Sequence, residues 1–291
     1  MNRLAGVILS VLLAGSISLS AQEKRALLIG IGQYAPETGW HQIHGDNDVA
    51  ISRSVLLKNG FSADNIRSLV NEEATFESID KAIQSLLAES KKKDIIYIQF
   101  SGHGQQITDL DGDEEDGFDE CWIPYDAGKT FISGVYSGQR HFTDDRLFGY
   151  LSKLRSRIGS EGKIIVISDA CHSGSGSRGE GDDIFFRGTD EKFVIPGAKA
   201  TRSFRRSPED DVQWLFVAAC KSYQTNYEHR LPTGQYCGSL TYVISEDQSD
   251  FLTTPYSTLI DGWKERLQSV AKFPQSIEEE GKPNRRSNYL F

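Results

Sequence analysis

Apolar runs alternate with amphipathic stretches along most of the chain. Continuous apolar runs are typical of strands in a parallel sheet that is buried on both faces, and they predict strands at residues 25–31, 66–70, 94–100, 163–168 and 214–218. Apolar residues at helical spacing predict helices at residues 46–57, 75–88, 143–154, 237–245 and 257–270. This alternation predicts an α/β fold with a doubly wound, mostly parallel sheet and helices on both faces.

Two segments interrupt the alternation. Residues 105–142 hold an acidic loop, at 105–120, and a predicted β-hairpin. Residues 172–211 are rich in Gly, Ser, Asp and Arg and have no sustained apolar period before Phe193. A loop of this length inside a compact domain is usually functional or flexible, so we predict a flexible loop at 172–211.

The N-terminal segment, residues 1–21, predicts a secretory signal peptide. Arg3 precedes an apolar run from Leu4 to Leu13, and small and polar residues follow as far as Ala21. The run is well short of the roughly 20 residues that span a bilayer. We therefore expect cleavage after Ser20 or Ala21, export to the periplasm or the medium, and a mature domain of residues 22–291 without a transmembrane segment.

The charge of the chain narrows its possible partners. The formal net charge is −9, and removal of the predicted signal peptide with Arg3 changes it by −1, to −10. Such a charge disfavours nucleic acid and anionic membrane as partners. We expect a monomer that acts on proteins or peptides.

The cysteines permit two interpretations. In an oxidising compartment the even count of Cys121, Cys171, Cys220 and Cys237 is compatible with two disulfides. Their wide spacing and the size of the domain favour a reactive thiol among them instead. Cys121 and Cys237 remain either packing residues or a disulfide pair.

Two predicted strands end in residues with chemical potential. The strand at 94–100 continues into Ser101-Gly102-His103-Gly104, and the strand at 163–168 continues into Asp169-Ala170-Cys171-His172-Ser173-Gly174. Ligand and catalytic groups of doubly wound sheets lie at the carboxyl ends of the strands, so an imidazole and a thiol are expected side by side. This is the arrangement of a Cys–His pair in which the imidazole assists the nucleophile.

Two other roles for these residues are disfavoured. His172 follows the thiol directly and is an alternative base, but side chains of adjacent residues usually point apart, which favours His103. A zinc site of His103, Cys171 and His172 would lack a fourth ligand at any usual spacing.

The two motifs, in this order and at this separation, resemble those of the metacaspase branch of the caspase-like cysteine peptidases, bacterial members included. The resemblance spans roughly residues 25–245. It implies a caspase-like three-layer α/β sandwich and a cysteine-type endopeptidase with the dyad Cys171 and His103. It also implies an oxyanion site made by the backbone N–H groups of Gly104 and Cys171.

Substrate preference is inferred from two acids. Asp169 precedes the predicted nucleophile by two residues, and Asp48 matches the segment in which metacaspases carry their other pocket acid. Two carboxylates in one pocket would select Arg or Lys before the scissile bond and repel Asp. Cys220, at the end of the last predicted strand, is expected to border this pocket. Asp48 could also serve only as an N-terminal acid of its helix.

The acidic loop suggests calcium. Residues 109–120 hold eight carboxylates in twelve positions, but Glu114 stands where an EF-hand requires glycine. The resemblance implies calcium ligands at Asp119, Asp144 and Asp145, whereas the remaining metacaspase ligand position falls on Arg178. We expect no cofactor for the chemistry itself and calcium as a modulator.

Three further possibilities follow from the sequence. The basic segment 199–206 is a candidate for cleavage by the protein itself. Specificity for Asp or Asn, as in caspases or legumains, is an alternative to Arg or Lys. A non-catalytic caspase-like scaffold is a second alternative, although such proteins typically lose the dyad that is present here.

Overall fold

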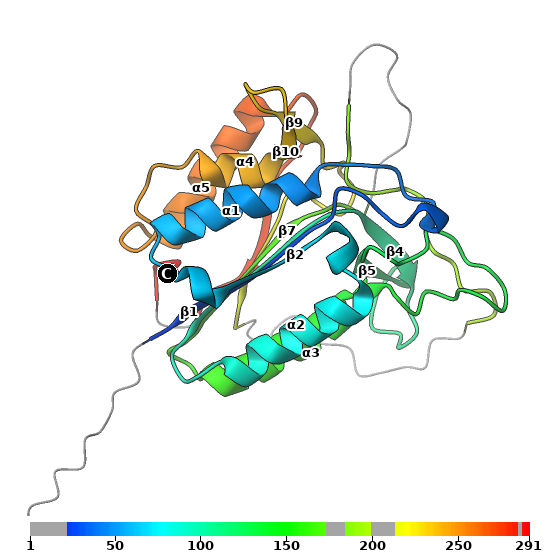
Figure 1. Ribbon diagram of the computed structural model, residues 1–291, viewed down its shortest axis with the longest axis horizontal. Coiled ribbons are helices and arrows are strands. Elements are labelled where there is room, and N and C mark those ends of the chain that lie inside the picture. The colour runs from blue at the N-terminus through cyan, green and yellow to red at the C-terminus, as the bar shows by residue number, and fades with distance from the viewer. Residues whose placement is uncertain (1–21, 173–183, 199–212, 285–286) are drawn as a thin grey trace, which may run out of the picture.

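The computed structural model describes residues 22–172, 184–198, 213–284 and 287–291 (Figure 1). The predicted signal peptide lies outside the described residues, so export stays a prediction. Among the helices of the described residues, none is long and apolar enough to cross a membrane.

In the described residues the main sheet has six strands, and five of them are parallel. The parallel strands are β1 (Lys24–Gly30), β2 (Ile66–Val70), β3 (Ile95–Ser101), β7 (Lys163–Asp169) and β8 (Leu215–Ala218). β11 (Glu278–Gly281) pairs antiparallel with β8, which gives the spatial order β11-β8-β7-β3-β1-β2. Successive side chains of β1 enter opposite cores, because the sheet is covered on both faces.

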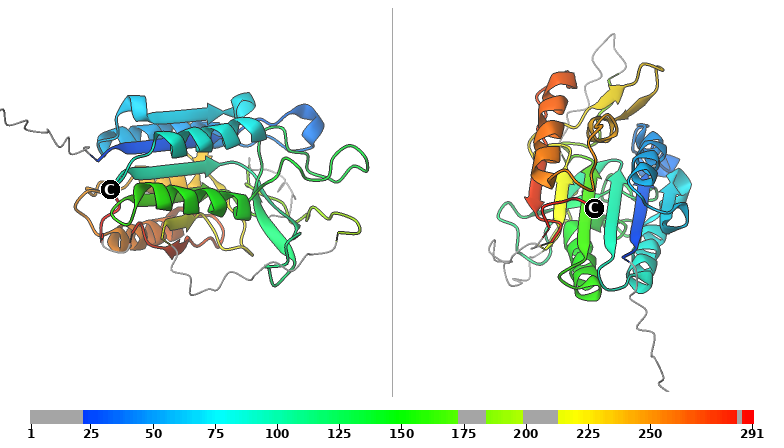
Figure 2. Two further views of the ribbon diagram at one scale, coloured as in Figure 1. Left: turned by 90° about the horizontal axis from the view of Figure 1, so that it is seen from below. Right: turned by 90° about the vertical axis from the view of Figure 1, so that its left-hand side faces the viewer.

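Helices form the outer layers of a three-layer sandwich. α2 (Phe76–Glu89) and α3 (Asp144–Ile158) cover one face of the sheet, and α1 (Gly45–Lys58), α4 (Ser239–Ser245) and α5 (Tyr256–Val270) cover the other (Figures 1 and 2). Ile83 and Leu151 belong to the first core, and Leu56 and Trp263 to the second. Short 3-10 helices lie at Pro36–Thr38, Ala63–Asn65 and Asn71–Glu73.

Two small antiparallel sheets lie beside the main sheet. One consists of β4 (Gly104–Thr108), β5 (Phe118–Trp122) and β6 (Phe142–Thr143), and the acidic loop joins its first two strands. The other is a hairpin of β9 (Glu228–Arg230) and β10 (Tyr236–Gly238). Both flank the carboxyl ends of the parallel strands, so they enclose the region where reactive residues were expected (Figure 1).

The predicted α/β architecture is confirmed. The β-hairpin predicted within residues 105–142 is also confirmed, as the antiparallel pair β4 and β5. Thr143 caps α3, because its side chain accepts a hydrogen bond from the N–H of Arg146 at 3.3 Å. The predicted helix at 237–245 starts too early, since Cys237 and Gly238 pair in β10 and the helix begins at Ser239. The sequence pattern also missed β9 and β11, which are short and polar.

Candidate active site

His103 lies just beyond β3 and is fully buried. Its main-chain N–H donates to the hydroxyl of Tyr34 at 2.7 Å, and its Nε2 lies 3.0 Å from the carbonyl oxygen of His41. Since a carbonyl can only accept, Nε2 carries the hydrogen and Nδ1 of the neutral ring has a free lone pair. Nδ1 is buried without a hydrogen-bond partner. Burial first, and then the neighbouring His41, hold the pKa of His103 well below its usual value, so the ring is neutral.

Cys171 follows β7, the strand next to β3. Ser101 pairs with Asp169 in the parallel register, so His103 and Cys171 each lie two residues beyond this paired position. A Cβ on Gly104 would stand 2.5 Å from the carbonyl oxygen of Cys171, so the two strand ends approach more closely than any other residue would allow. The structure therefore brings the histidine and the thiol to one edge of the sheet, as predicted.

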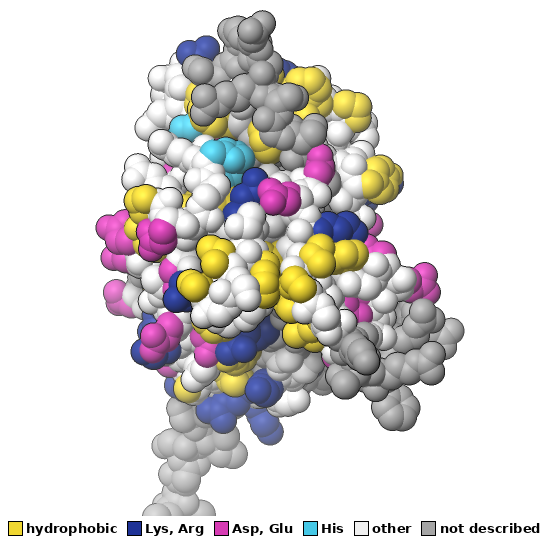
Figure 3. All heavy atoms as spheres, turned by 90° about the vertical axis from the view of Figure 1, so that its right-hand side faces the viewer, with side chains coloured by type: hydrophobic (Ala, Val, Ile, Leu, Met, Phe, Trp, Pro, Cys, Tyr) yellow, Lys and Arg dark blue, Asp and Glu magenta, His cyan; other side chains and the backbone are white. Residues whose placement is uncertain are grey.

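Cys171 is buried, with 1% of its surface exposed, and its Sγ lies 2.6 Å from the carbonyl oxygen of Gln224. Together with Cys220 it lines a cavity of about 640 Å³ that extends to the acidic loop. Figure 3 shows the side of the molecule at the carboxyl ends of the strands, where hydrophobic side chains gather in the middle and charged side chains surround them.

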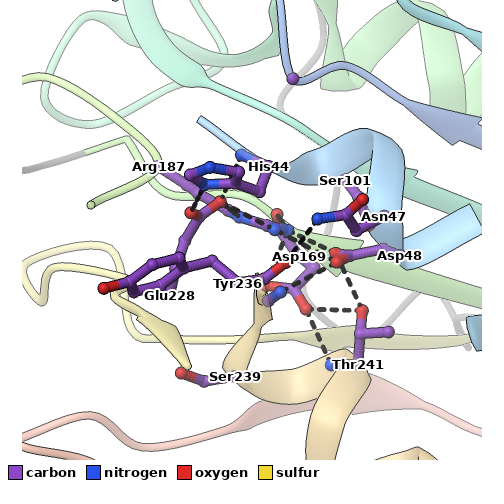
Figure 4. A network of polar contacts seen from close by, with 12 residues as sticks. His44, Asn47, Asp48, Ser101, Asp169, Arg187, Glu228, Tyr236, Ser239 and Thr241 are labelled. Carbon is purple, nitrogen blue, oxygen red and sulfur yellow. Dashed lines mark hydrogen bonds and ion pairs between the residues drawn. The ribbon is translucent and has the colours of Figure 1, made fainter. Parts of the chain in front are cut away.

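Asp48, in the first turn of α1, and Asp169, at the end of β7, lie close together and are both fully buried. Each accepts a hydrogen bond from the hydroxyl of Thr241, at 3.1 Å and 2.8 Å respectively. Asp169 also accepts from the side-chain amide of Asn226 at 2.9 Å. The predicted pairing of the two carboxylates is thus present (Figure 4).

An arginine of the same chain fills the space between these acids. The guanidinium of Arg187 is fully buried, and its Nη1 donates to Asp48 at 2.6 Å and lies 3.5 Å from Asp169 (Figure 4). Burial lowers the pKa of this guanidinium, but the surrounding carboxylates outweigh burial and raise the pKa well above its usual value. Burial raises the pKa of Asp48 to about 6, against the opposing effect of Arg187.

The main chain of Arg187 contacts the predicted nucleophile. The N–H of Cys171 donates to the carbonyl oxygen of Arg187 at 2.7 Å. In a cysteine peptidase this N–H is a donor of the oxyanion site, which binds the oxygen of a scissile carbonyl. Both ends of one residue, its side chain and its carbonyl, therefore lie where a substrate residue would be expected.

Glu228 completes the surroundings of the guanidinium. Its side chain is fully buried, and its Oε1 accepts from Nε of Arg187 at 3.0 Å. His44 binds the same carboxylate twice, through its main-chain N–H at 2.8 Å and its Nδ1 at 2.6 Å. The hydrogen bond to Glu228 raises the pKa of His44, and Arg187 and His44 together outweigh burial and lower the pKa of Glu228.

The other cysteines and the rival histidine are accounted for. All four cysteines lie in the described part of the chain and are buried, and none of them forms a disulfide, so the disulfide interpretation is wrong for this structure. His172 is half-buried beside Gly104, and desolvation lowers its pKa to about 4. It lines a small recess with Trp122 and Phe142, and it also lines the larger cavity that holds Cys171.

The acidic residues form groups that differ from the predicted set. Asp119 and Asp145 lie together with Asp113, whereas Asp144 lies with Glu114 and Glu120, each group having carboxylate oxygens within 4.8 Å of one another. The predicted trio of Asp119, Asp144 and Asp145 is therefore divided between two neighbouring groups. Arg178, which stands where metacaspases carry their remaining ligand, lies outside the described residues.

The local electrostatics of these groups favour a cation. Burial first, and then neighbouring acids, raise the pKa of Asp119 to about 7 and that of Asp144 to about 8. The Oδ1 atoms of Asp113 and Asp144 are buried without hydrogen-bond partners. Calcium binds oxygen ligands at about 2.3–2.6 Å, so oxygens within 4.8 Å of one another can share one ion. The residues present thus fit a calcium ion.

Sequence reasoning did not identify three contributors to these sites. Arg187 lies in a segment without periodicity, and Glu228 lies in a three-residue strand. Asp113 was noted only as part of an acidic run. Their roles depend on contacts between distant segments, which no local pattern records.

Comparison with known proteins assigns the family. The Caspase domain family matches residues 23–284, which is nearly the whole described chain. The chain belongs to the caspase-domain family. It has the caspase fold, and its similarity to metacaspases agrees with the resemblance of the two motifs.

The relatives of this caspase-domain chain are longer proteins. It is 31% identical over 161 residues to Metacaspase-1A of Neurospora crassa, an alignment that covers 52% of this chain and 32% of the relative. It is 32% identical over 161 residues to Metacaspase-1B of Aspergillus terreus, covering 52% and 38% respectively. The matched part thus spans about a third of the length of these relatives.

A solved structure extends the likeness in fold. The crystal structure of a Geobacter sulfurreducens protein matches with a TM-score of 0.61 at 21% identity, covering 92% of this chain and 97% of that one. At this identity the match supports the fold alone.

Proposed function

We propose that this protein is a cysteine endopeptidase that cleaves after Arg or Lys, with Cys171 as nucleophile and His103 as acid and base. The observation that carries the proposal is the position of Arg187. Its side chain lies between Asp48 and Asp169, and its carbonyl oxygen accepts from the N–H of Cys171. A basic residue is therefore held with its carbonyl at the thiol-bearing residue.

The proposed chemistry follows the ordinary course of thiol catalysis. Nδ1 of His103 takes the thiol proton, and the Sγ of Cys171 attacks the carbonyl carbon to form a tetrahedral oxyanion held by the N–H of Cys171. His103 then gives the proton to the leaving amine, the C–N bond breaks, and a thioester remains. Water hydrolyses the thioester and restores the thiol. The neutral state of His103 and the free lone pair on Nδ1 support this role.

We propose that the bond Arg187–Gly188 is the protein's own first substrate. The thioester would form on Arg187, and the amine of Gly188 would leave. The earlier candidate segment, 199–206, lies outside the described residues, and the contacts of Arg187 favour the new position. Because Arg187 fills the pocket, cleavage would have to precede the entry of other substrates.

We propose that calcium modulates the enzyme through the acidic groups. Asp113, Asp119 and Asp145 would hold one ion, and the group with Asp144 lies beside it. The ion would neutralise repelling carboxylates and order the acidic loop. The support is that Asp144 and Asp145 line the same cavity as Cys171, so loop order can affect access to the thiol.

We also propose that the protein is exported. N-terminal sequencing of the secreted or periplasmic protein should begin at Ala21 or Gln22. A mature protein that still begins at Met1 would contradict export by a cleaved signal.

A reporter assay tests the main proposal against its alternatives. The mature protein and its Cys171→Ala variant are incubated with peptides that end in Arg, Lys or Asp before the reporter group, with calcium or with a chelator. We expect cleavage after Arg and Lys by the wild type only. Strong cleavage after Asp would favour the alternative specificity, and no cleavage of any peptide would favour a non-catalytic scaffold.

A further inference from the structure

Glu228 contacts a different part of the arginine side chain from the two pocket acids. Its Oε1 lies 3.0 Å from Nε and 3.0 Å from Nη2 of Arg187. Asp48 contacts only the terminal nitrogens, Nη1 at 2.6 Å and Nη2 at 3.3 Å. The guanidinium is thus bound along two edges, and Glu228 binds the edge that includes Nε (Figure 4).

The Nε edge distinguishes the two basic residues. Arginine presents a planar set of donors that includes Nε, whereas lysine has a methylene group at the same distance from its main chain. The terminal charge of either residue can reach Asp48 and Asp169. A lysine would place the methylene against the carboxylate of Glu228 and leave that acid without its partner.

His44 holds Glu228 in the orientation that this contact needs. The main-chain N–H and Nδ1 of His44 bind the two carboxylate oxygens, at 2.8 Å and 2.6 Å. His44 is the N-cap residue of α1 and lies four residues before Asp48, so the start of one helix positions both carboxylates. The side chain of His44 also stacks on Tyr236, at 5.2 Å between ring centroids.

We propose that Glu228 is a specificity-determining residue that selects arginine over lysine at the position before the scissile bond, with His44 as its positioning residue. This inference rests on the proposed function and deepens it. The site has a buried, preorganised acceptor for Nε that serves no purpose toward a lysine substrate. A lysine substrate would leave this buried charged acceptor without a donor, which should lower kcat/KM for cleavage after lysine by about tenfold or more relative to arginine.

Two reporter peptides that differ only in Arg or Lys test the inference. We expect the self-processed wild type to have a kcat/KM for the Arg peptide at least about tenfold above that for the Lys peptide. Glu228→Gln should reduce this ratio to about threefold or less, mainly by lowering cleavage after Arg. Asp48→Asn is the matched control, because it should weaken cleavage after both residues and leave the ratio near its wild-type value.

A second assay measures the same selectivity within the chain. Arg187→Lys is made in the wild-type and Glu228→Gln backgrounds, and cleavage at 187–188 is followed over time after cell-free synthesis. We expect Arg187→Lys to slow cleavage by about tenfold or more when Glu228 is present and much less when Gln replaces it. His44→Ala, which keeps Glu228 but removes its support, should give an intermediate ratio.

The outcomes separate the inference from the proposed function. A wild type that cleaves neither reporter nor itself contradicts the proposed function. A wild type that cleaves Arg and Lys peptides equally well overturns only the role of Glu228, and so does an unchanged Arg to Lys ratio in Glu228→Gln. If Glu228→Gln fails to fold, the Arg to Lys ratios of the wild type and of His44→Ala still decide whether Glu228 selects arginine.

Discussion

The main-chain N–H of Cys171 donates a hydrogen bond to the carbonyl oxygen of Arg187 over 2.7 Å. The same arginine extends its side chain to Asp48 and Asp169, so one residue contacts both the predicted oxyanion donor and the predicted pocket acids. This relationship joins two predictions that the sequence made separately, a nucleophile and a preference for basic residues.

Removal of the guanidinium should destabilise the fold. In a Cys171→Ala background, which prevents cleavage, Arg187→Ala leaves buried carboxylates without their cation and should lower the free energy of unfolding by about 3–5 kcal/mol. The loss should be smaller near pH 5 than near pH 8, because carboxylates with raised pKa values can take up protons there. Urea unfolding at both pH values measures this. An equal stability of both proteins at pH 8 would show that the ion pairs contribute nothing.

The two histidines near the thiol should differ in their effect on catalysis. His103→Asn should slow cleavage after Arg by about 10³-fold, since general acid–base catalysis contributes about 10²–10⁴. His172→Asn is the matched control, because His172 lines the same cavity as Cys171 but is not the proposed base, and it should lose less than about tenfold. Single-turnover cleavage of an Arg reporter distinguishes them. A larger loss for His172→Asn would reverse the assignment of the base.

The close approach of the strand ends can be tested with two glycines. In Gly104→Ala the new Cβ would meet the main chain of Cys171 at 2.5 Å, and such displacement of reacting groups should slow cleavage by about a hundredfold. Gly149→Ala in α3, where nothing lies within 4 Å, should keep activity and add about 0.5–1 kcal/mol of stability. Full activity in Gly104→Ala would contradict the required approach.

The raised pKa values of the acidic groups predict that the stability of the fold depends on pH, and that bound calcium removes this dependence. Their folded-state pKa values are raised, to about 7 for Asp119 and about 8 for Asp144, so the folded protein holds these protons more tightly than the unfolded chain does. Their contribution to stability is therefore complete below about pH 4 and is lost as the pH rises through about 7 to 8.

Thermal unfolding measures this effect. With a chelator, Tm should fall between about pH 6 and pH 8, and calcium should restore it at pH 8. The double variant Asp119→Asn, Asp145→Asn should respond to calcium much less than the wild type. A calcium response of the wild-type size in that variant would place the ion elsewhere.

Much of the site was predictable because parallel strands end at one edge. His103 and Cys171 each follow a buried strand, and the register of β3 with β7 brings them together without further information. Asp169 follows the same rule as the last residue of β7, whereas Asp48 lies in the first turn of α1. The α/β architecture needed only the alternation of apolar runs and amphipathic stretches.

The remaining features depend on contacts that no local pattern encodes. Arg187 reaches the pocket from a long polar segment, and its burial is explained only by acids from three other elements. β11 escaped prediction because an edge strand of three glutamates and a glycine has low strand propensity. The acidic groups differ from the predicted set of calcium ligands, because the acidic loop brings Asp113, rather than Asp144, next to Asp119 and Asp145.

The central claim is that the protein holds its own Arg187–Gly188 bond as a substrate of Cys171. Intact-mass and N-terminal analysis of the purified wild type and Cys171→Ala variant tests it most directly. We predict a wild-type fragment that begins at Gly188, paired with one that ends at Arg187, and an uncut Cys171→Ala chain. An uncut wild-type bond, or the same cut in Cys171→Ala, would contradict the claim.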